Sequence, residues 1–253
     1  MINLKTENWE INNIETCLFD KDGTFIDLNR FWGRMTEMRV EEILKYTNSN
    51  PTLFKNLCLS LGYDSISGKM LKDGITALYS RMKIISIFQS DLKNFGIKIS
   101  EKELEKIFDE VSVNFNKNII EYTKPIDEAI NFIKKIRSLG IKTAIVTADS
   151  VETTNFIIKK LNWENLFDIA IGRETTKFPK ESGEPAKLAL KFLDASVNTT
   201  VMIGDAPTDF ICAKNAGIEK TILVATGQVQ EKDLSNFSKF ITKSLNKIEI
   251  IQN

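Results

Sequence analysis

The feature that most constrains this chain is a short apolar run followed at once by two acids and a glycine. Residues 17–19 are Cys-Leu-Phe, and the next five are Asp20-Lys21-Asp22-Gly23-Thr24. An apolar run that ends in a turn signal is typical of a buried strand. Ligands of open α/β sheets bind beyond the carboxyl ends of the strands, so the two acids favour a ligand-binding site. The alternative is a simple polar turn after the strand. An EF-hand loop is excluded, because its required Gly and acid positions hold Phe25 and Phe31.

The 253 residues include no histidine. This excludes Ser-His-Asp and Cys-His catalysis and histidine-ligated zinc, so any acid–base chemistry falls to carboxylates, Lys, Tyr or Cys. The three cysteines are far apart and form no Cys-x-x-Cys pair. That argues against a disulfide framework or a zinc site and favours a reducing, cytoplasmic location.

Charge and hydropathy argue against two classes of partner, nucleic acid and membranes, and leave a local basic groove open. Lys plus Arg (34) balances Asp plus Glu (34), so no global field attracts nucleic acid or an anionic membrane. No apolar run approaches the roughly 18 residues of a membrane span, and the N-terminal residues lack the pattern of a signal peptide. We expect neither a nucleic-acid nor a membrane partner.

Two kinds of pattern divide the chain. In residues 28–124 apolar residues recur at helical spacing, which predicts about four helices and no strand; Ser100 and Glu103 predict a capping box. From residue 125 onward, strands alternate with helices, which predicts a parallel sheet. Residues 1–13 are expected to be a loose lead-in or an edge strand. We therefore expect an α/β core domain of residues 1–27 and 125–253, with an all-α domain of residues 28–124 inserted after its first strand.

Three further features fall at predicted strand ends or before helices. Thr147 ends one strand, Lys180 lies in a loop before a helix, and Asp205 and Asp209 follow another strand. Each alone is weak, because a Thr or Asp often caps a helix and a Lys is usually exposed. Together with Asp20 and Asp22 they would place four carboxylates at one sheet edge, where like charges raise one another's pKa. A hard cation such as Mg²⁺, with phosphate oxygens as additional ligands, suits this set.

In the order of its motifs the sequence resembles the haloacid dehalogenase superfamily of phosphotransferases. Asp20-Lys21-Asp22-Gly23-Thr24 matches the first motif, Thr147 the second, Lys180 the third and Gly204-Asp205-x-x-x-Asp209 the fourth. The resemblance implies a Rossmann-like, doubly wound parallel sheet with an inserted helical cap, as in members resembling phosphoglycolate phosphatase and β-phosphoglucomutase. The loop after Lys180 departs from the usual Lys-Pro-x-Pro, which leaves Lys177 and Lys187 as alternatives for the third motif.

The resemblance also implies roles for these residues. Asp20 would be the nucleophile that becomes an aspartyl phosphate, and Asp22 the general acid and base. Mg²⁺ would be held by Asp20, the Asp22 backbone carbonyl and Asp205, while Asp209 would orient a bound water or Lys180. The residues expected to bind the phosphoryl oxygens are Thr147, Ala148, Lys180 and Gly23.

We therefore expect a Mg²⁺-dependent phosphatase of a small phosphorylated metabolite, acting as a monomer or homodimer. A phosphomutase of the β-phosphoglucomutase type and a non-enzymatic binding protein are the alternatives. Aspartyl-phosphate chemistry needs no histidine. Specificity would come from cationic side chains of the cap, for which the candidates are Arg30, Arg34, Arg81 and Lys83.

Overall fold

The computed structural model describes residues 1–252. Its contacts divide the chain into two compact units. We call Met1–Asp27 together with the chain from Pro125 onward the α/β unit, and Leu28–Lys124 the helical unit.

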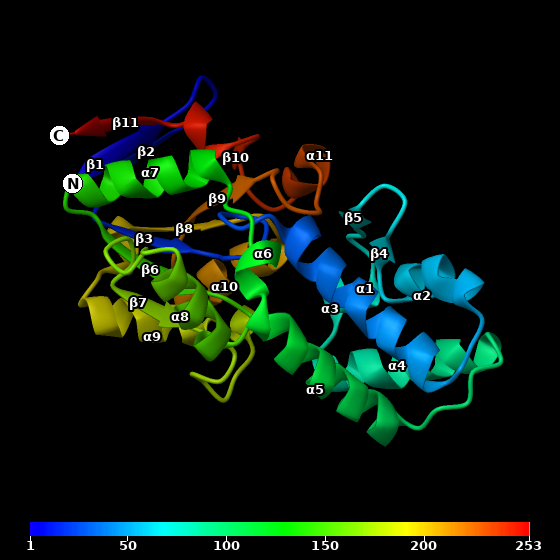
Figure 1. The fold of residues 1–253 in the computed structure, drawn as a ribbon. Helices are drawn as coiled ribbons and strands as arrows, with labels where there is room; N and C mark the ends of the chain where they lie inside the picture. The colour runs from blue at the N-terminus through cyan, green and yellow to red at the C-terminus, as the bar shows by residue number, and fades with distance from the viewer. Residues whose placement is uncertain (253) are drawn as a thin grey trace. The chain divides into compact units, whose positions relative to one another are not determined.

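The α/β unit is built on a six-stranded sheet in which every neighbouring pair is parallel. The order across the sheet is β10-β9-β8-β3-β6-β7, which places β3, the first strand of this sheet along the chain, at the centre (Figure 1). The predicted fold class is confirmed. The strands are β3 (Thr16–Phe19), β6 (Lys142–Val146), β7 (Ile169–Ile171), β8 (Thr200–Gly204), β9 (Lys220–Val224) and β10 (Phe240–Thr242).

Helices cover both faces of this sheet. Leu18, Val146 and Met202 of the strands pack on one face against apolar residues of α9 and α10, and Figure 1 shows α7 on the opposite side. All four residues of β3 are buried, as expected for a central parallel strand. The helices are α7 (Asp127–Ser138), α8 (Val151–Lys160), α9 (Glu184–Leu193), α10 (Pro207–Ala216) and the short α11 (Glu231–Leu234), with 3₁₀ turns η2 (Lys180–Ser182), η3 (Val197–Thr199) and η4 (Leu245–Lys247).

A second sheet joins the two ends of the chain. The strands β1 (Ile2–Lys5), β2 (Glu10–Ile14) and β11 (Glu249–Gln252) form an antiparallel sheet in the order β11-β1-β2. Trp9, at the turn between β1 and β2, donates from its indole nitrogen to the Ile241 carbonyl at 2.8 Å. The expectation of a loose lead-in was therefore wrong. The expected edge strand is present as β2, but β1 precedes it and pairs with a segment at the far end of the chain.

The helical unit has a more varied structure than predicted. Its described residues form six α-helices rather than about four. They also form a hairpin of two short strands, each two residues long, that the periodicity did not reveal. The capping box at Ser100 and Glu103 is confirmed. Phe31 and Phe115 meet edge to face in its core, with centroids 5.0 Å apart. The elements are α1 (Leu28–Tyr46), η1 (Pro51–Leu53), α2 (Phe54–Ser60), β4 (Tyr63–Asp64), β5 (Lys69–Met70), α3 (Ile75–Leu78), α4 (Arg81–Asn94), α5 (Glu101–Lys117) and α6 (Ile119–Tyr122).

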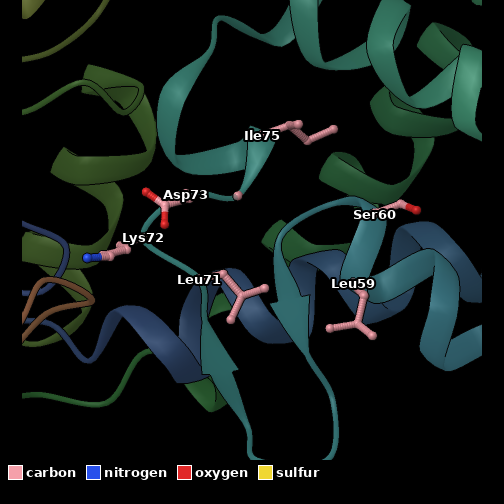
Figure 2. Close-up of a pocket in the computed structure, with 7 residues that line it drawn as sticks. Leu59, Ser60, Leu71, Lys72, Asp73 and Ile75 are labelled. Carbon is pink, nitrogen blue, oxygen red and sulfur yellow. The ribbon is translucent and has the colours of Figure 1, made fainter.

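An open pocket of about 430 Å³ lies within the helical unit (Figure 2). It is formed by the end of α2 and the segment between β5 and α3, with Leu59, Leu71 and Ile75 among its lining residues. The remaining lining residues are Ser60, Lys72, Asp73 and Gly74. All seven lining residues belong to the helical unit, and none of them is a predicted site residue.

The terminal sheet predicts a measurable stability effect. Leu4 of β1 is fully buried, whereas its neighbour Lys5 is exposed. Leu4→Ala should lower the free energy of unfolding by about 2–5 kcal/mol through lost burial and a cavity, and Lys5→Ala should change it by less than about 0.5 kcal/mol. Urea denaturation measures both. Equal, small effects would show that the terminal sheet adds nothing to the stability of the α/β unit.

Candidate active site

Strand register brings the predicted motifs to one edge of the sheet. Phe19, the last residue of β3, pairs with Ile145 of β6 on one side and with Ile203 of β8 on the other. Asp20 therefore follows directly, and two residues beyond these partners lie Thr147 and Asp205. Because β3 lies between β6 and β8, Asp20 is at the centre of the edge where parallel strands present ligand-binding groups.

Lys180 joins the nucleophile candidate to the acid of the last motif. Its Nζ lies 2.5 Å from Asp20 Oδ1 and 2.6 Å from Asp209 Oδ1, and all three side chains are buried. Burial alone would lower the pKa of Lys180, but the charges of Asp20 and Asp209 outweigh it and raise that pKa. Lys180 is therefore a permanent cation here. The alternatives, Lys177 and Lys187, are exposed.

Asp209 is held from a second direction. It lies in the first turn of α10, where its Oδ2 accepts a hydrogen bond from the Ala206 amide at 3.0 Å. A carboxylate in this position satisfies a backbone donor at the helix start and interacts favourably with the helix dipole. Its other oxygen pairs with Lys180, so both carboxylate oxygens have defined partners.

Asp205 lies in a cradle that only glycine permits. Gly23 has a φ of +88°, and a Cβ built there would lie 2.4 Å from Asp205 Oδ2; a Cβ on Gly227 would also collide with this carboxylate. Burial raises the pKa of Asp205 well above its usual range, and the charges of Asp20 and Asp209 add to this effect while Lys180 opposes it. The two glycines thus let backbone approach a carboxylate that lacks full charge compensation.

Three of these acids could hold a metal ion. One oxygen each from Asp20, Asp205 and Asp209 lies within 4.8 Å of the others, and all three residues are buried. Burial raises the pKa of Asp20 as well, against the opposing charge of Lys180. An all-oxygen ligand set with excess negative charge is the chemistry that hard divalent cations require.

Asp22 belongs to a separate ion-pair group that sequence reasoning missed. Lys21 Nζ lies 2.7 Å from Asp22 Oδ1 and 3.0 Å from Asp149 Oδ2. The Lys21 side chain is completely buried, although a lysine between two acids suggests an exposed turn. Burial raises the pKa of Asp22 to about 6, with Lys21 lowering it and Asp149 raising it. A carboxyl group with this pKa can both give and accept a proton near neutral pH.

The phosphate-binding candidates are placed differently from one another. Thr147 is buried at the end of β6, and its Oγ1 accepts from the Asp149 amide at 3.1 Å, while Ala148 is exposed. The Gly23 amide donates to the Ile26 carbonyl at 2.8 Å. Gly23 therefore serves the site by its missing side chain, whereas Thr147 offers a hydroxyl group at the sheet edge.

The three candidate arginines of the helical unit already have partners within that unit. Arg30 donates to the Glu121 carbonyl, Arg34 pairs with Glu37 and Glu41, and Arg81 pairs with Asp109, while Lys83 is exposed. Arg30 thus joins α1 to α6 and Arg81 joins α4 to α5, whereas both ion pairs of Arg34 lie within α1. Any contact of theirs with substrate remains a prediction.

Comparison with known proteins agrees with the site. A family model for haloacid dehalogenase-like hydrolases matches residues 14–217. The chain belongs to this family of hydrolases. The matched segment contains every predicted motif, and the terminal sheet strands β1 and β11 lie outside it. The family, the fold class and the enzyme class expected from the sequence, a phosphoric ester hydrolase, are thereby confirmed.

Individual relatives cover most of the chain. It is 26% identical over 217 residues to the phosphoglycolate phosphatase of Aquifex aeolicus, and this alignment covers 86% of this chain and 87% of the relative. It is 24% identical over 207 residues to the pyrophosphatase PpaX of Bacillus cereus strain G9842, spanning 81% and 80%. A crystal structure of a predicted phosphoglycolate phosphatase from Haemophilus somnus 129PT superposes with a TM-score of 0.71 at 12% identity, covering 93% of this chain and 96% of that one. This last similarity shows the fold.

The sequence predicts no membrane-spanning helix. Among residues 1–252, none of the helices combines the length and the apolar character that crossing a bilayer demands.

The glycine cradle predicts a site-specific loss. Gly23→Ala and Gly140→Ala both force alanine into a left-handed backbone, with φ of +88° and +76°, but a Cβ at Gly140 meets nothing. Backbone strain should cost each variant about 1–2 kcal/mol of stability, and Gly23→Ala should lose more because its Cβ also collides with Asp205. Only Gly23→Ala should also displace Asp205 and lower phosphate release by at least about tenfold. Thermal unfolding and phosphate-release assays separate the two effects, and equal activities in the two variants would contradict the proposed cradle.

Proposed function

We propose that this protein is a Mg²⁺-dependent phosphatase that hydrolyses a small phosphorylated metabolite through an aspartyl phosphate. The observation that carries the proposal is the environment of Asp20. This carboxylate ends the central strand, is buried, pairs with Lys180 and shares a group of oxygens with Asp205 and Asp209. The names of the relatives favour a phosphoglycolate-like ester, with pyrophosphate as a further candidate. Sugar phosphate esters stay part of the proposal because of the expected resemblance to β-phosphoglucomutase.

In the first step the Asp20 carboxylate attacks phosphorus opposite the leaving oxygen. A bond forms between Asp20 and phosphorus, the ester P–O bond breaks, and its electron pair goes to the leaving oxygen, which takes a proton from Asp22. The result is an aspartyl phosphate and a free alcohol. Lys180 and the Thr147 hydroxyl would stabilise negative charge on the phosphoryl oxygens, since phosphoryl transfer depends mainly on positioning and charge stabilisation.

In the second step water attacks the phosphorus of the aspartyl phosphate and gives a proton to Asp22. The bond between phosphorus and Asp20 breaks, its electron pair returns to the carboxylate, and inorganic phosphate leaves. Asp22 acts as acid in one step and as base in the other, which suits its pKa of about 6. A covalent carboxylate intermediate divides one difficult displacement into two.

The residues present fit the metal that the family implies. Asp20 and Asp205 would hold Mg²⁺ with the Asp22 carbonyl, and Asp209, already bound to Lys180 and the α10 backbone, would orient the other groups. When bound, Mg²⁺ would neutralise charge on the attacking carboxylate and the phosphoryl group. The strongly raised pKa of Asp205 is consistent with a site that has too little positive charge without a metal.

We further propose that the helical unit acts as the cap that selects the substrate. Closure of such a unit would exclude water from the site during transfer. Within it, Arg30, Arg34, Arg81 and Lys83 stay the candidate contacts to a substrate anion.

The direct test is phosphate release from a panel of phosphorylated metabolites by wild type and Asp20→Asn. Wild type should show Mg²⁺-dependent turnover, and Asp20→Asn should lose at least about 10³-fold because the amide cannot attack phosphorus. Asp127→Asn, the same exchange at an exposed position in the first turn of α7, should retain wild-type activity.

Each contrary outcome has a defined meaning. Turnover that survives in Asp20→Asn would overturn the nucleophile assignment. Phosphorus NMR that shows the phosphoryl group returned to a sugar, with no inorganic phosphate released, would identify a mutase. Absence of turnover and of aspartyl phosphate on every ester tested would favour the non-enzymatic alternative.

A pH dependence of stability follows from Asp205. Its folded-state pKa is raised, whereas an unfolded Asp titrates near 3.9. Proton binding to Asp205 therefore stabilises the metal-free fold at pH values below about 4, and this contribution is lost as the pH rises through the folded-state pKa. The stability of wild type minus that of Asp205→Asn should fall with rising pH in EDTA, and Mg²⁺ should reduce this fall. Urea denaturation at several pH values measures the difference, and a difference that rises with pH contradicts the assignment.

A further inference from the structure

We propose that Lys21 is the positioning residue for Asp22, through a buried Asp22–Lys21–Asp149 bridge that fixes the carboxyl group for proton exchange with the leaving oxygen. The inference rests on the proposed phosphatase function and goes beyond it, because it assigns a role to Lys21 and Asp149. Neither residue was among the sequence candidates.

The first observation is the geometry of the bridge. Lys21 Nζ lies 2.7 Å from Asp22 Oδ1 and 3.0 Å from Asp149 Oδ2. The lysine side chain has no exposed surface, and the two acid side chains are 11% and 10% exposed. Burying a lysine to this degree is costly unless it is paired with acids, so the bridge is a built feature of the site and not a solvated surface contact.

The second observation is that Asp149 is itself rigidly held. Its amide donates to Thr147 Oγ1, its Oδ1 accepts from the Ser150 amide at 2.7 Å, and its carbonyl accepts from the Arg173 amide at 2.8 Å. Asp149 therefore offers Lys21 a fixed negative charge in the loop after β6. Because β6 is paired in register with β3, the bridge ties the loop that carries Asp20 and Asp22 to the loop that carries Thr147.

The geometry also distinguishes the two oxygens of Asp22. Oδ1 accepts a hydrogen bond from the Lys21 ammonium group. In this proposal the proton that Asp22 exchanges is therefore carried on Oδ2. Without the lysine, Asp22 and Asp149 would be two neighbouring carboxylates with no cation between them, and repulsion would turn the Asp22 side chain away. Lys21 binds neither substrate nor metal in this account, and it acts through Asp22.

The test uses two substrates that differ in how much they need a proton. The phenolate released from p-nitrophenyl phosphate is stable in water without protonation, whereas the alkoxide of phosphoglycolate must be protonated as its P–O bond breaks. Lys21→Met should lower kcat/KM for phosphoglycolate, or for the best alkyl ester of the panel, by about 10²-fold, the scale of lost general acid catalysis. It should lower kcat/KM for p-nitrophenyl phosphate by less than about tenfold. Asp22→Asn provides the reference, with the same selectivity and a larger effect.

Matched variants separate positioning from general damage. Lys142→Met makes the same exchange at the opposite end of β6, where Lys142 donates to the Leu193 and Asp194 carbonyls, and it should leave the ratio of the two activities unchanged. Asp149→Asn keeps the shape of the acceptor but removes its charge and should shift the ratio in the same direction as Lys21→Met. Lys21→Arg should recover part of the alkyl-ester activity.

The outcomes decide the proposal separately from the proposed function. Equal losses on both substrates in Lys21→Met would overturn the positioning role. If Lys21→Met does not fold, Asp149→Asn decides, and an unchanged ratio there overturns the proposal. A wild type that hydrolyses neither ester with Mg²⁺ would overturn the phosphatase function itself, and with it the role of Lys21.

Discussion

The constraint on which the site depends is the balance of buried charge at the edge of the central sheet. Five carboxylates gather there, and two buried lysines compensate them in part: Lys180 between Asp20 and Asp209, and Lys21 between Asp22 and Asp149. Asp205 is left without a lysine of its own, and burial, together with the charges of Asp20 and Asp209, raises its pKa. The two lysines cancel only part of the negative charge, so the remaining carboxylate oxygens have the chemistry that could hold a divalent cation.

Each lysine also joins chain segments that are distant in sequence. Lys180, in a 3₁₀ turn before α9, connects the loop after β3 to the start of α10. Lys21 connects the loop after β3 to the loop after β6. Ion pairs therefore connect the segments that follow β3, β6 and β8, with β3 in the middle. All four residues of β3 are buried. The geometry needed for in-line attack can then be held by side chains on rigid elements.

The parts of this arrangement that follow from local pattern could be predicted from the sequence. The apolar run before Asp20, the alternation after residue 125 and the helical periodicity of residues 28–124 were enough for the fold class. Parallel strands present their carboxyl ends together, which was enough to group Asp20, Thr147 and Asp205. The terminal sheet was missed, because β1 gains its partner β11 from the other end of the chain, and no short window contains that pairing.

Lys21 shows why the charge balance itself could not be predicted. The run Asp20-Lys21-Asp22-Gly23 has the local composition of an exposed turn. The burial of Lys21 depends on its ion pair with Asp149, which follows a different strand. The only signal in the sequence for the burial of Lys21 is Asp149, two residues past Thr147. This signal becomes informative once the pairing of β3 with β6 is known. The acids of such a site can be found by motif because chemistry dictates their spacing. The cations that allow those acids to be buried depend on tertiary contacts, so their roles become visible only when the register of the sheet is known.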